Sequence, residues 1–269
     1  MTFYGRRGRG WFMEQSSPLS VLEIVKSGTL DLRLASLLWV IMERRASVLV
    51  AAGPSNAGKS TTLNVMLDFL RPEVKRIDLN GDEEDFSFLK SARPATTYMV
   101  AAEFSDWGAY VWGEVALKAF ELLTQGYGLG GTIHAQTDEE VIGILHEYLG
   151  LDAPTLGRID AIVTLRVTGG RGYDAEPIRR INSVSLVMPR TKGLSLAVLA
   201  RPGSNGGFDI AGEKELQLAL SSRLNIKNGS VTAEMEEREQ ILRKLLDDGK
   251  VSRDEVRKAV VEYYKSHPA

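Results

Sequence analysis

Residues 47–60 read SVLVAAGPSNAGKS, and this stretch decides the fold class. Its first part, Ser47 to Ala52, is short, continuously apolar and rich in valine, which is typical of a strand buried on both faces. Its second part, Gly53 to Ser60, has the pattern G-x-x-x-x-G-K-S/T of a phosphate-binding loop. A helical pattern follows from Lys59 to Leu70. The loop therefore joins a buried strand to a helix, which is the context that phosphate binding requires.

Each position of the loop has a physical role. Gly53 and Gly58 let the backbone curl so that successive N–H groups point at phosphate oxygens, and the helix N-terminus adds its positive dipole end. Lys59 places a charge on the β- and γ-phosphates, and the Ser60 hydroxyl is a ligand for Mg²⁺. The alternative is a glycine-rich turn with a surface lysine. We predict that ATP and Mg²⁺ bind here, through Gly53, Pro54, Ser55, Asn56, Ala57, Gly58, Lys59, Ser60 and Thr61.

Strand and helix patterns alternate around this loop and predict an α/β fold with a mostly parallel sheet covered on both faces. Strands are expected at 74–79, 97–104, 109–112 and 129–133, and helices at 17–27, 30–44, 114–125 and 138–149. Consecutive strand patterns at 159–167, 178–187 and 194–199 predict an antiparallel extension. Charged helical patterns at 213–224, 232–248 and 252–266 predict a C-terminal helical appendage. We therefore expect a flexible tail over 1–16, an ATPase core over 17–212 and a helical region over 213–269.

Composition excludes several classes of protein. The 269 residues are 25% charged with a net charge of −2, which is ordinary globular usage and gives no general attraction to nucleic acid. Because there is no cysteine, disulfides, thiolate zinc sites and a cysteine nucleophile are excluded. No apolar run reaches the ~18 residues of a membrane span. We expect a cytoplasmic protein.

Two glutamates compete for the role of catalytic carboxylate. A nucleotide hydrolase needs an acidic residue at a strand end near Mg²⁺, to orient or deprotonate the attacking water. Glu114 follows the expected strand 109–112, and it is our first choice as catalytic residue and as Mg²⁺ ligand. Glu103, at the end of the preceding apolar run, is the alternative. His134 follows the expected strand 129–133 and would face the ligand crevice at the carboxyl edge of the sheet.

A second glycine pattern, Gly126-x-Gly128-x-x-Gly131, matches the dinucleotide-binding fingerprint. It follows a predicted helix and precedes a predicted strand, which is the reverse of the order that pyrophosphate binding needs. We interpret it as a tight helix-to-strand connection.

Taken together, GPSNAGKSTTLNVMLDFLRP at 53–72 and YVWGEVALKAFELLTQGYGLGGTIHA at 110–135 resemble the secretion and pilus-assembly ATPases of type II, type IV and tight-adherence systems. The matching motifs are the phosphate loop, Gly113-Glu114 as the end of a Walker B strand, and Thr132-Ile-His134-Ala135 as a histidine box. The resemblance extends over about residues 29–210 and implies a RecA-like core. It places an acidic box near 75–85, where Glu84 is the candidate catalytic carboxylate. Because only 52 residues precede Gly53, we expect the separate N-terminal domain of that family to be absent.

The resemblance implies an ATPase that serves as the motor subunit of a secretion or pilus-assembly system. It also implies a homo-oligomer, a hexameric ring, working with a membrane-embedded platform protein at the inner face of the membrane. Glu114 would act on the water and His134 would sense the γ-phosphate. The family's arginines before Walker B are missing, so Arg179 or Arg180 is expected to reach a neighbouring subunit's site. The alternatives are an ATP-binding regulatory or adaptor subunit with little turnover, and a nucleic-acid-translocating ATPase, which the neutral charge disfavours.

Overall fold

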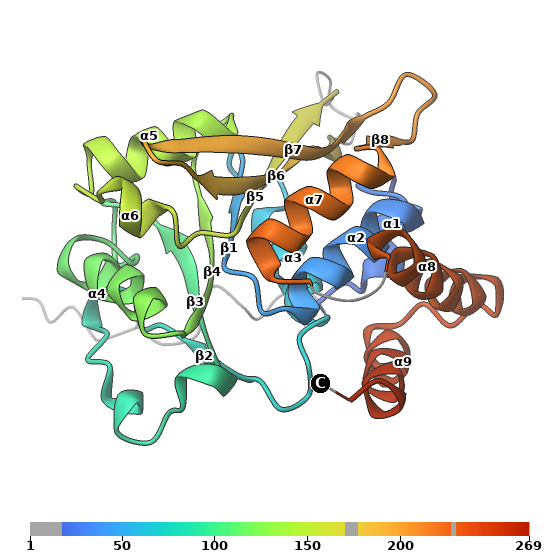
Figure 1. Ribbon diagram of the computed structural model, residues 1–269, viewed down its shortest axis with the longest axis horizontal. Coiled ribbons are helices and arrows are strands. Elements are labelled where there is room, and N and C mark those ends of the chain that lie inside the picture. The colour runs from blue at the N-terminus through green and yellow to red at the C-terminus, as the bar shows by residue number, and fades with distance from the viewer. Residues whose placement is uncertain (1–17, 170–176, 227–229, 269) are drawn as a thin grey trace, which may run out of the picture.

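The computed structural model describes residues 18–169, 177–226 and 230–268. Within them the chain forms an eight-stranded sheet of order β2-β3-β4-β1-β5-β6-β7-β8 (Figure 1). Strands β1 to β5 are parallel, and β6 to β8 continue the sheet in antiparallel fashion. The strands are β1 (Val48–Ala51), β2 (Lys75–Asp78), β3 (Thr97–Phe104), β4 (Gly128–Ile133), β5 (Ala161–Thr168), β6 (Ile178–Pro189), β7 (Leu194–Pro202) and β8 (Phe208–Ile210).

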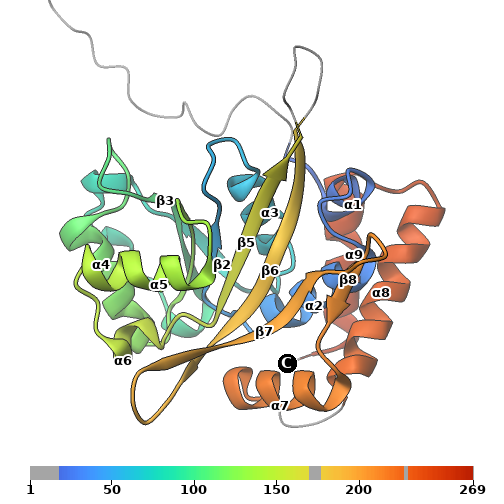
Figure 2. The same ribbon diagram turned by 90° about the horizontal axis from the view of Figure 1, so that it is seen from above.

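Helices cover both faces of this sheet (Figure 2). On one face lie α4 (Gly113–Thr124), α5 (Asp138–Glu147) and α6 (Ala153–Leu156). On the other lie α1 (Val21–Lys26), α2 (Leu32–Glu43), α3 (Lys59–Leu67), α7 (Glu213–Leu224), α8 (Val231–Asp247) and α9 (Arg253–Ser266). Short 3₁₀ turns at Gly81–Glu83, Ser87–Lys90 and Pro94–Thr96 connect β2 to β3. The residues of β1 alternate between the two cores, so this strand is buried on both faces as predicted.

The structure confirms the predicted α/β fold class: a mostly parallel sheet flanked by helices, with an antiparallel extension and C-terminal helices. Strand β8 and the short helix α6 were not predicted. The strand expected at 109–112 is wrong, since only Val111 forms an isolated bridge, to Phe104. A Cβ on Gly81 would clash with the Ala109 carbonyl oxygen, which shows how closely this segment packs against the turn after β2.

The second glycine pattern has a structural explanation. Gly126 has φ +92° and turns the chain from α4 into β4. A Cβ on Gly128 would come within 3.0 Å of the Tyr98 ring, and one on Gly131 within 3.0 Å of the Phe104 ring. These glycines let β4 pack against two aromatic rings of β3, so a helix-to-strand connection is confirmed.

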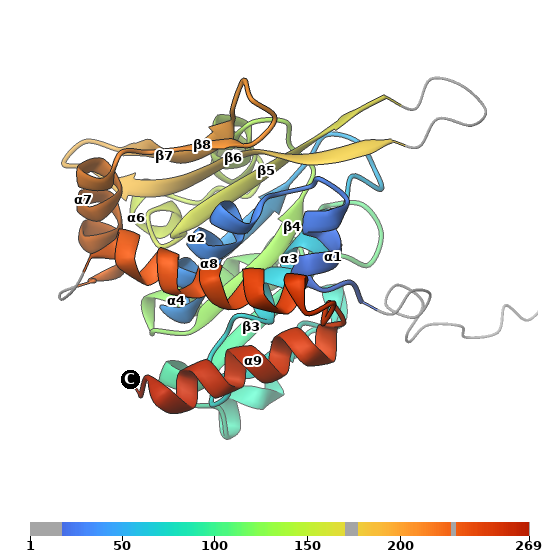
Figure 3. The same ribbon diagram turned by 90° about the vertical axis from the view of Figure 1, so that its right-hand side faces the viewer.

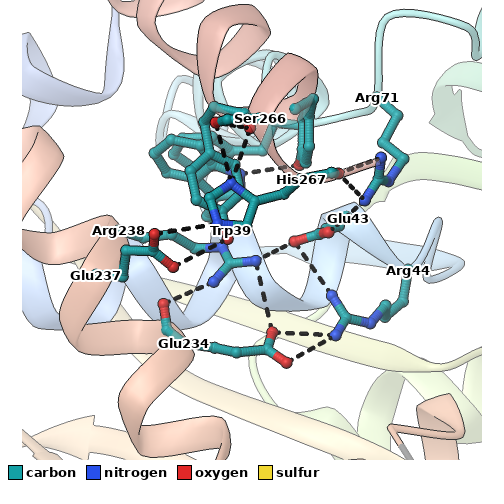
Figure 4. A network of polar contacts seen from close by, with 12 residues as sticks. Trp39, Glu43, Arg44, Arg71, Glu234, Glu237, Arg238, Ser266 and His267 are labelled. Atoms are coloured by element: carbon teal, nitrogen blue, oxygen red, sulfur yellow. Dashed lines mark hydrogen bonds and ion pairs between the residues drawn. The ribbon is translucent and has the colours of Figure 1, made fainter. Parts of the chain in front are cut away.

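A buried ion network joins α2 to the C-terminal helices (Figure 4). The Glu43 carboxylate, at the end of α2, binds the Arg238 guanidinium of α8 and lies 2.8 Å from Arg71 and 3.1 Å from Arg44. Arg44 also pairs with Glu234 at 3.0 Å. The Arg238 side chain is only 1% exposed. We call these five residues the Glu43 network.

The far end of α3 is attached to α9. Asp68 accepts two hydrogen bonds from the Arg253 guanidinium, at 2.6 and 2.7 Å, and lies 3.1 Å from Arg257. The Tyr264 hydroxyl donates to the Phe69 carbonyl at 2.6 Å. The C-terminal helices therefore share the hydrophobic core of α2 and α3, and α8 and α9 lie side by side along that face (Figure 3).

The domain boundary expected at residue 212 stays a prediction, and the tail expected over 1–16 lies outside the described residues. In the described part of the chain, none of the helices is long and apolar enough to cross a membrane.

Candidate nucleotide-binding site

One edge of the sheet collects the candidate functional residues. The phosphate loop follows β1, Glu103 lies near the end of β3, and His134 follows β4. Because β6 runs antiparallel to β5, its first residues lie at the same edge, where Ile178 is in register with Thr168. Arg179 is therefore carried to the edge that holds the phosphate loop. Strands β5 and β6 extend beyond their neighbours there (Figures 2 and 3).

The phosphate loop has the backbone conformation that its sequence predicts. Gly58 has φ +90° and caps α3, which begins at Lys59. A Cβ on Gly53 would lie 2.7 Å from the Gln136 Cγ, so the loop beside His134 packs directly on this glycine. Asn56 also adopts a left-handed conformation, with φ +57°. Glycine is thus required at both ends of the loop, at one for its dihedral angle and at the other for space.

Lys59, Glu103 and His134 meet at this loop. The Lys59 Nζ lies 3.8 Å from the Glu103 Oε2 and 3.1 Å from the His134 Nε2. The same Nε2 lies 2.9 Å from the Glu103 Oε1. The His134 Nδ1 lies 3.1 Å from the Gly53 carbonyl, which can only accept, so this nitrogen donates. His134 is thus tied to the first residue of the loop, and its Nε2 faces both a cation and a carboxylate.

The Lys59 side chain is buried, so its charged ammonium group needs an anionic partner. Lys59 is only 6% exposed, and burial lowers its pKa, while the neighbouring Glu103 carboxylate opposes that shift. A buried ammonium is costly unless it is paired. Glu103 supplies that pairing here.

A cavity of about 1100 Å³ opens over these residues. Of the nine predicted nucleotide-binding residues, Ser55 to Thr61 line it, whereas Gly53 and Pro54 do not. Glu103 and His134 line it too, and Glu103 is the one carboxylate among the lining residues that the structure describes. The remaining lining residues are Leu19, Ile24, Ser27, Thr29, Thr62, Ser105, Trp107, Tyr110, Leu165, Pro177, Ile178 and Arg179.

Two of the predicted catalytic carboxylates lie elsewhere. Glu114 is exposed in the first turn of α4 and does not line the cavity. Glu84 accepts hydrogen bonds from the backbone N–H groups of Asn80, at 2.8 Å, and Phe86, at 2.7 Å. Its carboxylate therefore stabilises the turn in which it lies. The structure therefore brings His134 and the alternative Glu103 to the phosphate loop, but not Glu114 or Glu84.

The two candidate arginines have different surroundings. The Arg179 Nε donates to the Asn56 carbonyl of the same chain at 2.8 Å. The Arg180 guanidinium binds the Gly206 and Gly207 carbonyls and lies over the Phe208 ring, 4.6 Å from its centroid. The expectation that one of them acts on a neighbouring subunit stays a prediction. Within its own chain, Arg179 lies on the phosphate loop and Arg180 does not.

The residues present fit a Mg²⁺ ion only in the way that Mg²⁺ binds with a nucleotide. Among the described residues there is no cluster of three or more His, Asp or Glu side chains that could hold a metal. Mg²⁺ keeps several water ligands and needs only one or two protein groups beside the phosphates. The exposed Ser60 hydroxyl in the cavity is such a group, whereas the other predicted ligand, Glu114, does not line the cavity.

Comparisons with known proteins give limited likenesses. No family profile matches the chain. The uncharacterized protein MJ0900 of Methanocaldococcus jannaschii is 31% identical over 150 residues, which are 46% of this chain and 26% of that protein. The chain thus matches about a quarter of that relative's length.

Three solved structures are similar in part. The VirB11 ATPase of the Brucella suis type IV secretion system has TM-score 0.39 and 17% identity, covering 61% of this chain and 54% of its own. The pilus retraction motor PilT with bound ADP has TM-score 0.37 and 18% identity, and the match covers 82% of this chain and 64% of PilT. The Legionella pneumophila ATPase DotB has TM-score 0.34 and 11% identity, and the match covers 83% of this chain and 63% of DotB. At these TM-scores the likenesses carry no argument about function.

Proposed function

We propose that this chain binds ATP with Mg²⁺ and hydrolyses it, as the motor subunit of a secretion or pilus-assembly system. The observation that carries the ATPase proposal is the cluster of Lys59, Glu103 and His134 on the phosphate loop. The order of the motifs along the sequence supports the finer assignment to secretion or pilus assembly.

The cluster suggests how nucleotide binding and catalysis are linked. In the structure Glu103 pairs with the buried Lys59. The phosphates of ATP carry more negative charge than one carboxylate, so they would replace Glu103 as the partner of Lys59. Glu103 would then be free to accept a proton from the attacking water. His134, anchored on the Gly53 carbonyl, would stay beside the terminal phosphate and report its presence.

Ser60 would hold the Mg²⁺ ion together with the β- and γ-phosphates. When bound, the ion neutralises charge that develops on the transferred phosphoryl group.

The test compares the two glutamates. Steady-state phosphate release and ATP affinity are measured for the wild-type protein and for Lys59→Ala, Glu103→Gln and Glu114→Gln. Lys59→Ala should lose ATP binding. Glu103→Gln should keep it but lose turnover by about 10²-fold or more, because an amide cannot accept the proton. Glu114→Gln should behave like the wild type. Loss of turnover in Glu114→Gln alone would show that the wrong carboxylate has been chosen.

One outcome would select a different function. If the wild-type chain binds ATP tightly and releases no phosphate even at high protein concentration, it is a regulatory or adaptor subunit and not an ATPase. Stimulation of phosphate release by single-stranded DNA would instead indicate a nucleic-acid-translocating ATPase.

The proposed assembly is a homo-oligomer, a hexameric ring, at the cytoplasmic face of a membrane-embedded platform protein. It is supported by the motif resemblance. Sedimentation with and without ATP, together with the dependence of specific activity on protein concentration, tests it. A particle that stays monomeric with ATP, and whose specific activity does not change with concentration, would contradict it.

A further inference from the structure

The cavity has two chemically different halves, one on each side of β1. On the side of β3 and β4 it holds the ionisable Glu103 and His134, with Trp107 and Tyr110 at its end. On the side of β5 and β6 it is lined by Leu165, Ile178 and Arg179. The segment at α1 adds Leu19 and Ile24 with the small polar Ser27 and Thr29. The phosphate loop lies between the two halves because β1 is the strand between β4 and β5.

Among the described residues, the second half offers apolar side chains that are partly exposed. Ile178 is 57% exposed and Leu19 is 42% exposed, although both line the cavity, whereas Leu165 in the same lining is buried. The apolar residues of this wall suit a flat heteroaromatic group.

Arg179 marks the border between the phosphate loop and this apolar half. Its Nε is fixed on the Asn56 carbonyl at 2.8 Å, and a Cβ on Gly58 would lie 3.3 Å from its Cδ. The side chain therefore lies against the phosphate loop at Asn56 and Gly58. A guanidinium held by one nitrogen keeps its flat face available, and arginine stacks on aromatic rings through that face.

We infer that the nucleoside half of the nucleotide lies on the β5–β6 side, with its base between the α1 segment and Ile178 and against the Arg179 guanidinium. The inference rests on the proposed function, because Glu103 and His134 fix the side on which the terminal phosphate lies. The base must then leave the loop in the opposite direction. Arg179 is a binding residue for the nucleoside, supplied by the same chain, and not an arginine that acts on a neighbour's γ-phosphate.

The opposite orientation has its own candidate. Trp107 follows β3, lines the other end of the cavity and is 79% exposed. A base stacked on Trp107 would reverse the nucleotide and direct its terminal phosphate towards Arg179. The two orientations predict losses of affinity in different variants.

The experiment measures the affinities of ATP, ADP and inorganic tripolyphosphate by calorimetry. The variants are Arg179→Ala, Arg179→Lys and Trp107→Ala. The matched control is Arg166→Ala, since Arg166 lies opposite Arg180 in the same pair of strands, is exposed and does not line the cavity. Circular dichroism confirms that each variant is folded.

Arg179→Ala should weaken ATP and ADP to the same extent, by about tenfold, and leave tripolyphosphate unchanged, because a stacked base is lost and no phosphate contact is. Arg179→Lys, which keeps the charge without the flat guanidinium, should lose most of the same affinity. Arg166→Ala and Trp107→Ala should bind all three probes as the wild type does. An equal loss for tripolyphosphate, a loss in Trp107→Ala, or unchanged nucleotide affinity in Arg179→Ala would each overturn the inference. Failure of the wild type to bind either nucleotide would instead refute the proposed function.

Discussion

Replacing Glu43 by glutamine should destabilise the fold much more than replacing its buried partner Arg238 by methionine. The Glu43 network holds three guanidinium groups and two carboxylates. Glu43→Gln leaves the three cations with Glu234 alone, and Glu234 is 3.5 Å from Arg238. Arg238→Met leaves two cations and two carboxylates, with Arg44 and Arg71 still on Glu43.

The sizes of the two effects follow from this charge count. Breaking a buried pair so that one charge is left without compensation costs about 3–5 kcal/mol. We expect Glu43→Gln to lose that much, because Arg238 is 1% exposed and cannot reach water. Arg238→Met fills a similar volume and leaves no orphaned charge, so it loses the contacts with the Tyr263 and Trp39 rings, worth about 1–2 kcal/mol.

Urea unfolding followed by far-UV circular dichroism measures both variants and the double variant Glu43→Gln/Arg238→Met. The double variant should be more stable than Glu43→Gln alone, since it removes one of the uncompensated cations. A free energy of unfolding that falls as much in Arg238→Met as in Glu43→Gln would refute the charge argument. So would a double variant less stable than either single one.

Three further predictions concern residues near the site. Burial raises the pKa of Asp138 above its ordinary 3.8, although two serine hydroxyls of β6 bind the carboxylate. Because the pKa is higher in the folded than in the unfolded chain, the wild type is most stable below pH 3.8 and loses stability as the pH rises through the folded-state pKa. Asp138→Asn has no such carboxyl group. Its urea midpoint should therefore equal that of the wild type below pH 3.8 and exceed it at higher pH. Arg180→Ala should leave the ATP affinity in calorimetry unchanged, because no hydrogen bond among the described residues joins this guanidinium to the phosphate loop. It should lower the free energy of unfolding by about 1–3 kcal/mol, because the guanidinium binds the Gly206 and Gly207 carbonyls. Gly131→Ala should lower stability by about 1–3 kcal/mol in urea unfolding, since the new Cβ would clash with the Phe104 ring.

The sequence was sufficient for features that depend on neighbouring residues. The buried strand, the phosphate loop and the start of α3 are adjacent in the chain, and their patterns are those of β1, Gly58 and Lys59 in the structure. The start of α9 is equally local: a helix is predicted from 252, and in the structure Ser252 and Glu255 form a capping box there.

The choice between Glu103 and Glu114 depended on tertiary packing and could not be made from the sequence. Residues 109–112 look like a strand because they are apolar and are followed by glycine and glutamate. In the structure that segment packs against the turn at Gly81, and Glu114 lies in the first turn of α4 and does not line the cavity. The residue pattern at 109–112 does not show that β3 has already ended just after Glu103.

The position of Arg179 could not be predicted for a similar reason. Nothing around Arg179 and Arg180 in the sequence shows which of them faces the phosphate loop. The direction of β6 and its register with β5 decide this, and both depend on pairing between distant residues.

The attachment of α9 to Asp68 has a mechanical consequence. Helix α3 is a rod of nine residues, about 14 Å long, with the phosphate loop at one end and the carboxylate of Asp68 just beyond the other. Two arginines of α9 hold that carboxylate, and a tyrosine of the same helix holds the next carbonyl. If nucleotide binding displaces α3 along its axis, α9 has to travel with it or these ion pairs have to break. A fluorophore on the outer surface of α9 would then register events at the loop from the opposite end of the rod.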